Sequence, residues 1–491
     1  MNSLMNKLKN ALTMNPHPGP LPSDGRGRLF GRLAGKAAAV QGFKTRAVVR
    51  GSLTLKLTLA PRSSWAGWAW GASVLAATAC LGQEIILTPQ KSNGVYEVGE
   101  KIQWRVELRG DSAASVTNLH YVLKKGGWTV MREGQINLAA GAGMLEAQLD
   151  EPGTILAEVE ASLPARKIKA LGGAVAAPEK IRPSASPPAD FDAFWTGKIA
   201  ELVAVPPHPV LEPAESDKAA VEYYKIQMDN IRGSHIYGQL AKPKREGKFP
   251  AILIVQWAGV YGLPKGNVIG QAEKGWLALN IMAHDLPFDK PEDFYKQASQ
   301  TTLKDYVAIG NEDRERSYFL RMYLSCYRAA DYLAGRPDWD GRTLVVTGTS
   351  QGGLQAIMTA GIHPKITALM ANVPAGCDRT GPWVGRAAGW PGWYGQGANG
   401  QKITETSRYY DVMNFASRVK CPALVAVGLI DTTCPPSGVL AACNQFQGPK
   451  EIVTMVNSGH QDVKNSQARY YARFNAWNKA LVQGETVPPR L

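Results

Sequence analysis

Three residues in the second half of the chain, Ser350, Asp431 and His460, have the types and the order that nucleophilic catalysis requires. A serine hydroxyl becomes reactive when a histidine removes its proton, and a carboxylate must hold that histidine in the correct tautomer. The chemistry that these side chains could perform together is acyl transfer through a covalent intermediate on Ser350.

Ser350 lies in the stretch Gly-Thr-Ser-Gln-Gly at residues 348–352. An apolar, β-branched run precedes it and a helix-forming run at 354–360 follows it, which predicts a buried strand, a tight turn and a helix. Gly348 and Gly352 bracket the serine because a side chain at either position would collide with the neighbouring strand or helix. The alternative is an ordinary glycine-rich turn between a strand and a helix.

Two histidines follow Ser350 and compete for the role of general base. His363 lies about one helix length after the serine, where the pattern predicts a helix end on the surface. His460 directly follows the last predicted strand (451–456) and its short turn. Catalytic loops gather at the carboxyl ends of parallel strands, so we predict that His460 is the base.

Three aspartates could orient this base. Asp431 comes directly after an apolar strand, so it should open to the same edge of the sheet. Asp411 lies in a polar, helix-like stretch and Asp378 lies among Gly and Arg residues. We therefore predict Asp431, which also gives the order Ser, Asp, His that α/β-hydrolases use.

The oxyanion that forms on attack needs two backbone N–H donors. Gln351 opens the predicted helix after the serine, where free amides point outwards. The loop 256–262, which follows the strand 251–255, should supply the second donor, and we favour the Val260 amide, with Tyr261 next. The chain has no metal-ligand spacing and no phosphate-binding loop, so the predicted mechanism needs neither metal nor cofactor.

The positive charge of the chain is concentrated at its start. Residues 1–62 hold eleven Lys or Arg and one Asp, residues 63–82 are uncharged, and +10 of the net +14 therefore belongs to the first 62 residues. This distribution argues against a nucleic-acid surface on the folded part. The length of 491 residues predicts at least two folded units.

Residues 63–82 have the layout of a secretory signal, with Arg62 before an apolar core and small residues at the end. Cleavage after Ala79 or Gly82 fits this layout. The alternatives are a membrane anchor, for which about fifteen apolar residues are short, and a lipoprotein attached through Cys80. We expect a secreted or periplasmic protein whose residues 1–62 are a disordered extension.

Five of the six cysteines follow the signal segment, so at least one thiol is unpaired. No pair has the spacing of a zinc site or of a redox motif. Cys434 and Cys443 either form a disulfide or remain buried thiols.

The folded part divides by pattern into two domains. Residues 83–165 show seven short alternating strands, which predicts a small immunoglobulin-like β-sandwich in which Trp104 and Trp128 belong to the core. Residues 166–190 are small and proline-containing, and we expect a linker there. From 191 to 485 a helix is followed by alternating strands and helices, which predicts a mostly parallel sheet covered on both faces.

Several stretches resemble the acetylxylan esterase and cephalosporin C deacetylase family of carbohydrate esterases. They are Gly-Thr-Ser-Gln-Gly-Gly at 348–353, Gly-Leu-Ile-Asp-Thr-Thr-Cys-Pro-Pro-Ser at 428–437, Gly-Pro-Lys-Glu-Ile at 448–452, Gly-His at 459–460, and 318–333 followed by Arg-Pro. The resemblance covers roughly residues 185–485. It implies an α/β-hydrolase fold, deacetylation of small or sugar-borne esters, often a ring-shaped oligomer, and catalytic roles for Ser350, Asp431 and His460.

The chain departs from this family around the pocket. It has Ala-His-Asp at 283–285 where the family has Arg-Gly-Gln, Ala-Gly at 258–259 where the family has His-Gly, and Gln461 where the family has Glu. Trp257, Tyr261 and His284 are candidate substrate contacts, although His284 could instead fold the altered loop.

These observations favour a secreted serine esterase that removes acetyl groups from xylan-type saccharides. The expected partners are the acetylated saccharide substrate and, in a homo-oligomer, further copies of the same chain. A serine carboxylesterase or peptidase with a non-sugar substrate is the alternative within enzymes. A sugar-binding or scaffolding protein with a decayed hydrolase domain is the alternative outside them.

Overall fold

The computed structural model of the chain describes residues 84–110, 116–163 and 166–487. The predicted basic extension, the signal segment and Cys80 lie outside the described residues. None of the helices in the described ranges combines the length and the apolar character needed to cross a membrane.

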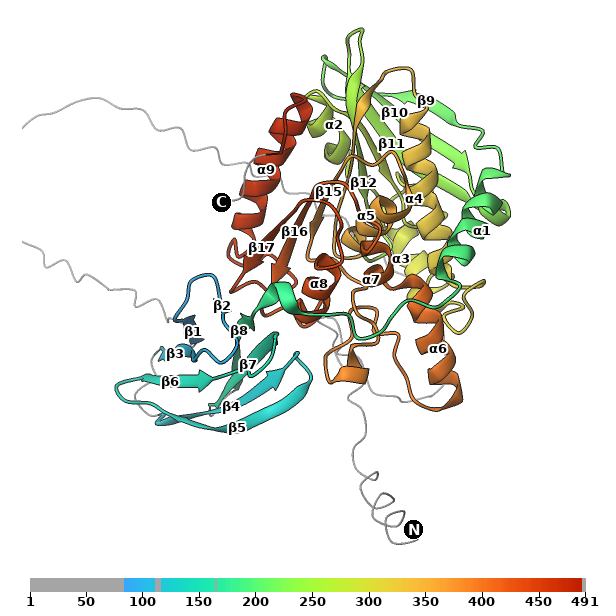
Figure 1. Cartoon of the computed structure of the whole chain (residues 1–491). Coiled ribbons are helices and arrows are strands. Elements are labelled where there is room, and N and C mark those ends of the chain that lie inside the picture. Colours follow the sequence, from blue (N-terminus) through green and yellow to red (C-terminus); the bar gives the residue numbers. More distant parts are fainter. Residues whose placement is uncertain (1–83, 111–115, 164–165, 488–491) are drawn as a thin grey trace, which may run out of the picture. The chain divides into compact units, whose positions relative to one another are not determined.

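The first described part is all-β (Figure 1). Three strands form one sheet in the order β1-β3-β6 and five form another in the order β2-β8-β7-β4-β5. The strands are β1 (Glu84–Pro89), β2 (Val95–Tyr96), β3 (Ile102–Arg109), β4 (Asn118–Lys125), β5 (Thr129–Asn137), β6 (Ala142–Ala147), β7 (Gly153–Ser162) and β8 (Lys167–Ala176). Apolar side chains of both sheets share one core around Trp104, as the alternation in β3 predicts. The immunoglobulin-like connectivity stays a prediction.

Two expectations for this part are wrong. The first half of the predicted linker is strand β8, which pairs with β7 along its length. Its Ala and Gly residues serve close packing, since a Cβ on Gly172 would lie 2.7 Å from a Leu87 methyl group. Trp128 is not in the core, because it lies in the turn between β4 and β5 and is 50% exposed.

The second part contains a nine-stranded sheet in the order β17-β16-β15-β14-β12-β13-β11-β10-β9. Strands β12 to β17 run parallel, and β9, β10 and β11 form an antiparallel edge. The strands are β9 (Val210–Ala214), β10 (Val221–Asp229), β11 (His235–Pro243), β12 (Phe249–Val255), β13 (Leu277–Ile281), β14 (Trp339–Thr349), β15 (Ala368–Asn372), β16 (Ala423–Gly428) and β17 (Lys450–Met455). The predicted mostly parallel sheet is confirmed.

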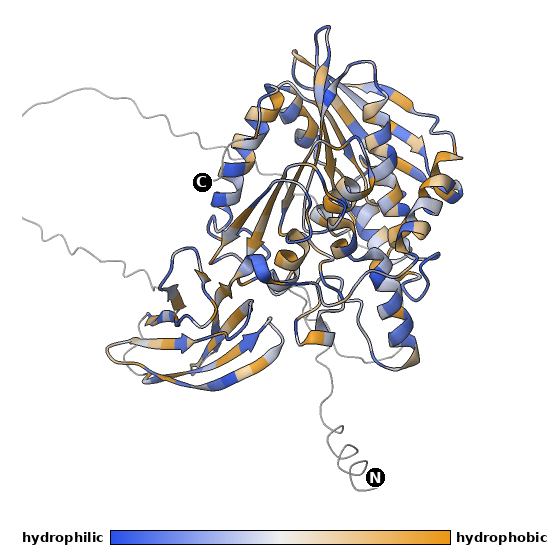
Figure 2. Cartoon of the chain, in the orientation of Figure 1, coloured by the Kyte–Doolittle hydropathy of each residue, from blue (hydrophilic) through white to orange (hydrophobic). Residues whose placement is uncertain are grey.

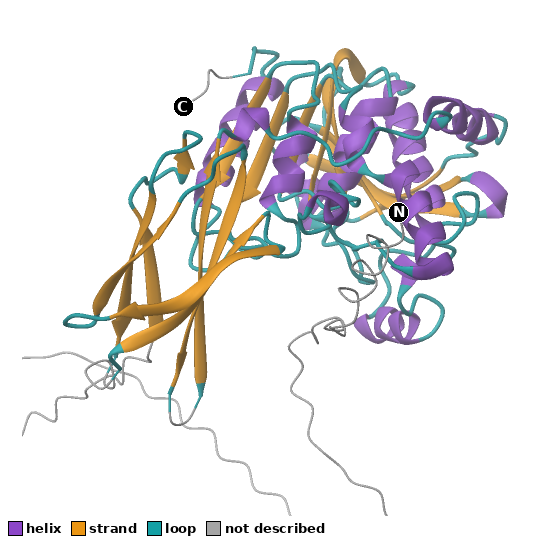
Figure 3. Ribbon diagram, turned by 60° about the horizontal axis from the view of Figure 1, so that its bottom comes forward, coloured by secondary structure: helices purple, strands orange, loops and turns teal. Residues whose placement is uncertain are grey.

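Helices cover both faces of this sheet (Figure 3). They are α1 (Phe191–Val203), α2 (Gly266–Ala272), α3 (Glu292–Gln300), α4 (Tyr318–Ala334), α5 (Gln351–Ile362), α6 (Gly397–Tyr410), α7 (Val412–Ala416), α8 (Pro436–Cys443) and α9 (Ala468–Val482). Short 3-10 turns lie at Pro178–Lys180, Ile231–Gly233, Tyr306–Ala308 and Gly381–Val384.

The central strands are apolar on both faces, as a doubly covered parallel sheet requires. In β12, Ala251, Leu253 and Val255 join the core beneath α1, α4 and α5, while Ile252 joins the core beneath α2 and α9. The continuous hydrophobic colour of these strands in Figure 2 reflects the double burial. Two apolar cores therefore fix the strand ends from which the candidate site is built.

The cysteines of the described ranges are free thiols. Cys434 and Cys443 are both buried, so the alternative of buried thiols holds and the disulfide does not form.

Candidate active site

Ser350 sits on a strained turn between β14 and α5. Its φ is 58° and its ψ is −119°, a backbone region that non-glycine residues rarely adopt. A Cβ on Gly352 would lie 2.6 Å from the carbonyl oxygen of Val255, and one on Gly348 would collide with the Gly352 backbone. The turn therefore needs both glycines for the predicted reason, and it presents the serine at the carboxyl edge of the sheet.

Replacing Gly352 by alanine should lower the free energy of unfolding by about 1–3 kcal/mol, because the added methyl group must displace strand β12 or helix α5. Gly197→Ala is a matched control, since Gly197 lies in helix α1 and its added Cβ would meet nothing within 4 Å. That control should be stabilised by up to about 1 kcal/mol. Urea denaturation of both variants is the measurement, and equal stabilities would contradict the close approach at Gly352.

The structure brings Ser350, His460 and Asp431 into one hydrogen-bonded series. His460 Nε2 lies 2.8 Å from Ser350 Oγ, and His460 Nδ1 lies 2.9 Å from Asp431 Oδ2. A carboxylate only accepts, so Nδ1 carries the proton and the Nε2 lone pair faces the serine hydroxyl. This is the tautomer that a general base requires.

Asp431 is held by the backbone that follows β16. Its Oδ1 accepts hydrogen bonds from the amides of Thr433 and Cys434, both at 2.8 Å, and its side chain is fully buried. The carboxylate therefore cannot turn away from His460 without leaving these two amides unpaired.

The other residues considered for the acid and the base, Asp411, Asp378 and His363, have partners outside this series. Asp411 caps helix α7 through the Met413 amide, and burial near Asp378 raises its pKa to about 6. Asp378 accepts from the Ser184 amide and pairs with a nearby arginine. His363 ends helix α5 as predicted, but it is buried against Asp331 rather than exposed.

The two predicted oxyanion donors lie at the same edge of the sheet. Gln351 is the first residue of α5, where the amide has no acceptor within the helix. Val260 follows Gly259, whose φ of 118° turns the loop after β12. Within the ranges that the structure describes, the Val260 amide donates to no protein acceptor, so it remains available to a ligand.

His284 is buried against the loop after β12 and holds its backbone. It is fully buried, its Nε2 lies 2.9 Å from the Gly259 carbonyl oxygen, and its Nδ1 lies 2.8 Å from the Tyr318 hydroxyl. A carbonyl only accepts, so Nε2 carries the proton and Nδ1 accepts from Tyr318. Of the two alternatives for this residue, the structure supports the folding role.

Tyr306 connects the two sides of the proposed oxyanion hole. Its hydroxyl accepts from the Gly259 amide at 3.3 Å and donates to Gln351 Oε1 at 2.6 Å. Its ring also contacts the His284 ring edge-on, with the ring centroids 4.8 Å apart. Sequence reasoning missed both tyrosines as parts of the site, because Tyr306 lies in no quoted stretch and Tyr318, at the start of the stretch 318–333, was considered only for the family resemblance.

Stability should depend on the charge of His284. Burial lowers the pKa of His284 from 6.5 to about 4, so the unfolded chain takes up this proton first as the pH falls. As the pH falls from 6.5 to 4, protonation of His284 in the unfolded chain should lower the free energy of unfolding by about 3 kcal/mol. Denaturant titrations at several pH values give the slope of the free energy of unfolding against pH. His284→Gln, which keeps the hydrogen-bonding groups, should remove the slope between pH 6.5 and 4.

The exposed His120 provides the control for that measurement. His120→Gln should retain the wild-type slope between pH 6.5 and 4. A slope that persists in His284→Gln would show that another group is responsible.

The remaining candidate contacts, Trp257 and Tyr261, lie on the loop after β12. Trp257 is 55% exposed, and the Tyr261 hydroxyl donates to the Trp257 carbonyl oxygen. Burial raises the pKa of Tyr261 far above its ordinary value, so this phenol stays protonated. Tyr261 follows Val260 in the chain, and the Trp257 ring lies 5.7 Å from the Tyr261 ring, centroid to centroid.

One group of potential metal ligands occurs among the described residues, formed by Asp431, Cys434 and His460. Burial, with Asp431 nearby, raises the pKa of the Cys434 thiol well above its usual value. Metals bind the thiolate, and Asp431 already pairs with His460. The arrangement therefore suits proton transfer better than metal binding.

Sheet order, nucleophile elbow and the Ser, Asp, His series together define an α/β-hydrolase. Residues 177–477, more than half of the chain, match the acetyl xylan esterase (AXE1) family. The chain belongs to this family.

Individual relatives agree with this assignment. Acetyl esterase Axe7A of Xylanibacter ruminicola is 34% identical over 289 residues, which are 57% of this chain and 65% of that protein, so the chain covers less than two thirds of this relative. An acetyl xylan esterase from Paenibacillus sp. R4 has a TM-score of 0.51 and 25% identity over 61% of this chain and 98% of its own. Acetyl xylan esterase 1 from Thermoanaerobacterium sp. JW/SL YS485 has a TM-score of 0.51 and 22% identity, over 60% of this chain and 96% of its own. At this identity the likeness supports the fold alone.

Proposed function

We propose that this protein is a serine carbohydrate esterase that hydrolyses acetyl esters on xylan-type oligosaccharides and polysaccharides. The observation that carries the proposal is the hydrogen-bonded series from Asp431 through His460 to Ser350, in a chain of the acetyl xylan esterase family. A serine esterase uses such a series together with two amide donors, for which Gln351 and Val260 are the candidates.

In the proposed reaction, Ser350 Oγ attacks the acetyl carbonyl carbon while its proton passes to His460 Nε2. The amides of Gln351 and Val260 stabilise the resulting oxyanion. The sugar alcohol leaves with the proton from His460, and acetyl-Ser350 remains. Water then attacks this ester with His460 as base, which releases acetate and restores the serine.

Acetate release from acetylated xylan, beside hydrolysis of p-nitrophenyl acetate, tests the proposal. We expect both substrates to be hydrolysed. Hydrolysis of the aryl ester alone would keep the serine mechanism and reject the saccharide substrate, in favour of a carboxylesterase for other esters. Hydrolysis of neither would reject the esterase.

We also propose that the protein is secreted or periplasmic, on the basis of the signal-like segment at 63–82. Expression of the full chain in a Gram-negative host, followed by amino-terminal sequencing of the exported protein, should give a start near Gln83. An uncleaved protein found only in the cytoplasm would contradict this.

A homo-oligomer is the third proposal, and it rests on the family resemblance alone. Light scattering of the purified protein should give a mass of several chains, and a monomeric mass would contradict it.

A further inference from the structure

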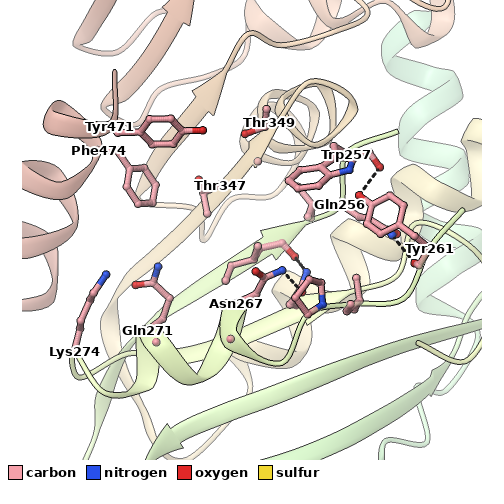
Figure 4. A pocket seen from close by; sticks show the side chains of 18 of the residues that line it. Gln256, Trp257, Tyr261, Asn267, Gln271, Lys274, Thr347, Thr349, Tyr471 and Phe474 are labelled. Atoms are coloured by element: carbon pink, nitrogen blue, oxygen red, sulfur yellow. Dashed lines mark hydrogen bonds between the residues drawn. The ribbon is translucent and has the colours of Figure 1, made fainter. Parts of the chain in front are cut away.

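A cavity of about 360 Å³ lies beside the candidate active site (Figure 4). It opens at the carboxyl ends of β12 and β14, on the sheet face that α2 and α9 cover. The chain passes from β12 to β13 on one side and returns to β14 on the other, so these two strands form the point where the strand order reverses. Open α/β sheets bind ligands in the crevice at such a point.

The cavity shares walls with the catalytic groups but does not contain them. Thr349, which immediately precedes Ser350, lines it on the strand side. Trp257 and Tyr261, which flank the Val260 amide, line it on the loop side. A molecule held here would therefore be adjacent to an ester bound at Ser350, without occupying the position of that ester.

Aromatic side chains form two walls of the cavity. Trp257 and Tyr261 lie on one side in Figure 4, and Tyr471 and Phe474 from α9 lie on the other. Trp257 is 55% exposed and Tyr471 is 42% exposed, so their rings are accessible to a ligand. Large accessible rings of this kind offer apolar faces on which the C–H groups of a sugar ring can pack.

Helix α2 supplies polar groups between the two walls. Asn267 Nδ2 donates to Asn280, and Gln271 Oε1 accepts from Asn478. Among the described residues, Oδ1 of the Asn267 side chain and Nε2 of the Gln271 side chain have no hydrogen-bond partner. One acceptor and one donor therefore remain for a ligand. Lys274 is the one charged residue in the described lining, and no carboxylate is part of it.

This composition selects among ligand classes. A nucleotide or another phosphate monoester carries close to two negative charges at pH 7, which Lys274, the one charged residue of the described lining, would not neutralise. An aliphatic chain would leave the amides of α2 unpaired. A neutral polyhydroxyl ring satisfies both the aromatic walls and the amide groups.

We propose that this cavity is a saccharide subsite, which holds a glycosyl unit adjacent to the acetylated unit whose ester is cleaved at Ser350. The inference rests on the proposed function and extends it, because it assigns the polymer-binding residues to α2, α9 and the loop after β12. Its principal residues are Trp257, Asn267, Gln271 and Tyr471.

Isothermal titration of the full chain with xylotetraose, which carries no ester, tests binding apart from hydrolysis. The wild type should bind the oligosaccharide, and Tyr471→Ala should weaken binding about three- to tenfold through loss of one aromatic face. Gln271→Ala should weaken it by a similar factor. Phe294→Ala removes an aromatic ring that is 36% exposed and lies outside the cavity, so this variant should bind as the wild type does.

Thermal unfolding of each variant identifies misfolding, and Tyr471→Phe, which keeps the ring, should bind within about twofold of the wild type. The subsite proposal would be overturned if the wild type did not bind xylotetraose. It would also be overturned if Tyr471→Ala and Gln271→Ala bound xylotetraose as tightly as the wild type does. If acetylated xylan is still deacetylated in that case, only the subsite fails. If p-nitrophenyl acetate alone is hydrolysed, the proposed function fails.

Discussion

Ser350→Ala should lower kcat for acetyl ester hydrolysis by about 10⁵- to 10⁶-fold, because removal of a serine nucleophile abolishes the acyl-enzyme route. The residual rate should come from the oxyanion donors and from substrate binding, which the substitution leaves in place. Acetate release and p-nitrophenyl acetate hydrolysis should fall together, since both reactions share the covalent step.

Ser437→Ala is the matched control for this variant. Ser437 is fully buried and the proposed nucleophile is largely buried, but the Ser437 hydroxyl has no hydrogen-bond partner among the described residues. Its removal should therefore leave kcat within about twofold of the wild type. A fluorophosphonate probe should label the wild type and Ser437→Ala, and it should leave Ser350→Ala unlabelled. Labelling of Ser350→Ala would place the nucleophile elsewhere.

The residues that come directly after strands could be predicted from the sequence. Each strand before a predicted catalytic residue is a short apolar run, and a parallel sheet gathers the residues after such runs at one edge. Ser350, Asp431 and His460 were predicted in this way, and the structure places His460 within hydrogen-bond distance of both Ser350 and Asp431.

Contacts between segments far apart in the chain could not be predicted. Strand β8 is rich in Ala and Gly, which in isolation is typical of a linker. Close packing explains two of its small residues, because Gly172 lies against Leu87 and Trp104 and Gly173 lies against the Leu429 backbone. His284 and Tyr306 contact each other beside the loop after β12, where both bond Gly259. Two irregular segments bring them together, and neither segment has a periodicity that would reveal this. The residues of α9 that line the cavity follow a helical pattern that also suits simple burial.

Asp431→Asn should lower kcat by about 10³- to 10⁴-fold while the fold is kept. The amides of Thr433 and Cys434 both donate to Oδ1, so the new side chain must place its carbonyl oxygen there. Its NH₂ group then faces His460 Nδ1, which must become the acceptor. The ring proton moves to Nε2, and the histidine can no longer take the proton of Ser350.

Asp462→Asn is the control for that effect, because Asp462 is an exposed carboxylate on the same loop as His460. It should retain kcat within about twofold, whereas Asp431→Asn should also react much more slowly with the fluorophosphonate probe. Steady-state kinetics beside thermal unfolding separate the tautomer effect from misfolding. An Asp431→Asn enzyme that keeps more than about a tenth of wild-type kcat would mean that another group orients His460. The buried Asp378 and Asp411 bond other partners. Of these three acids, only Asp431 holds the proton on His460 Nδ1, so only its replacement should block proton transfer from Ser350.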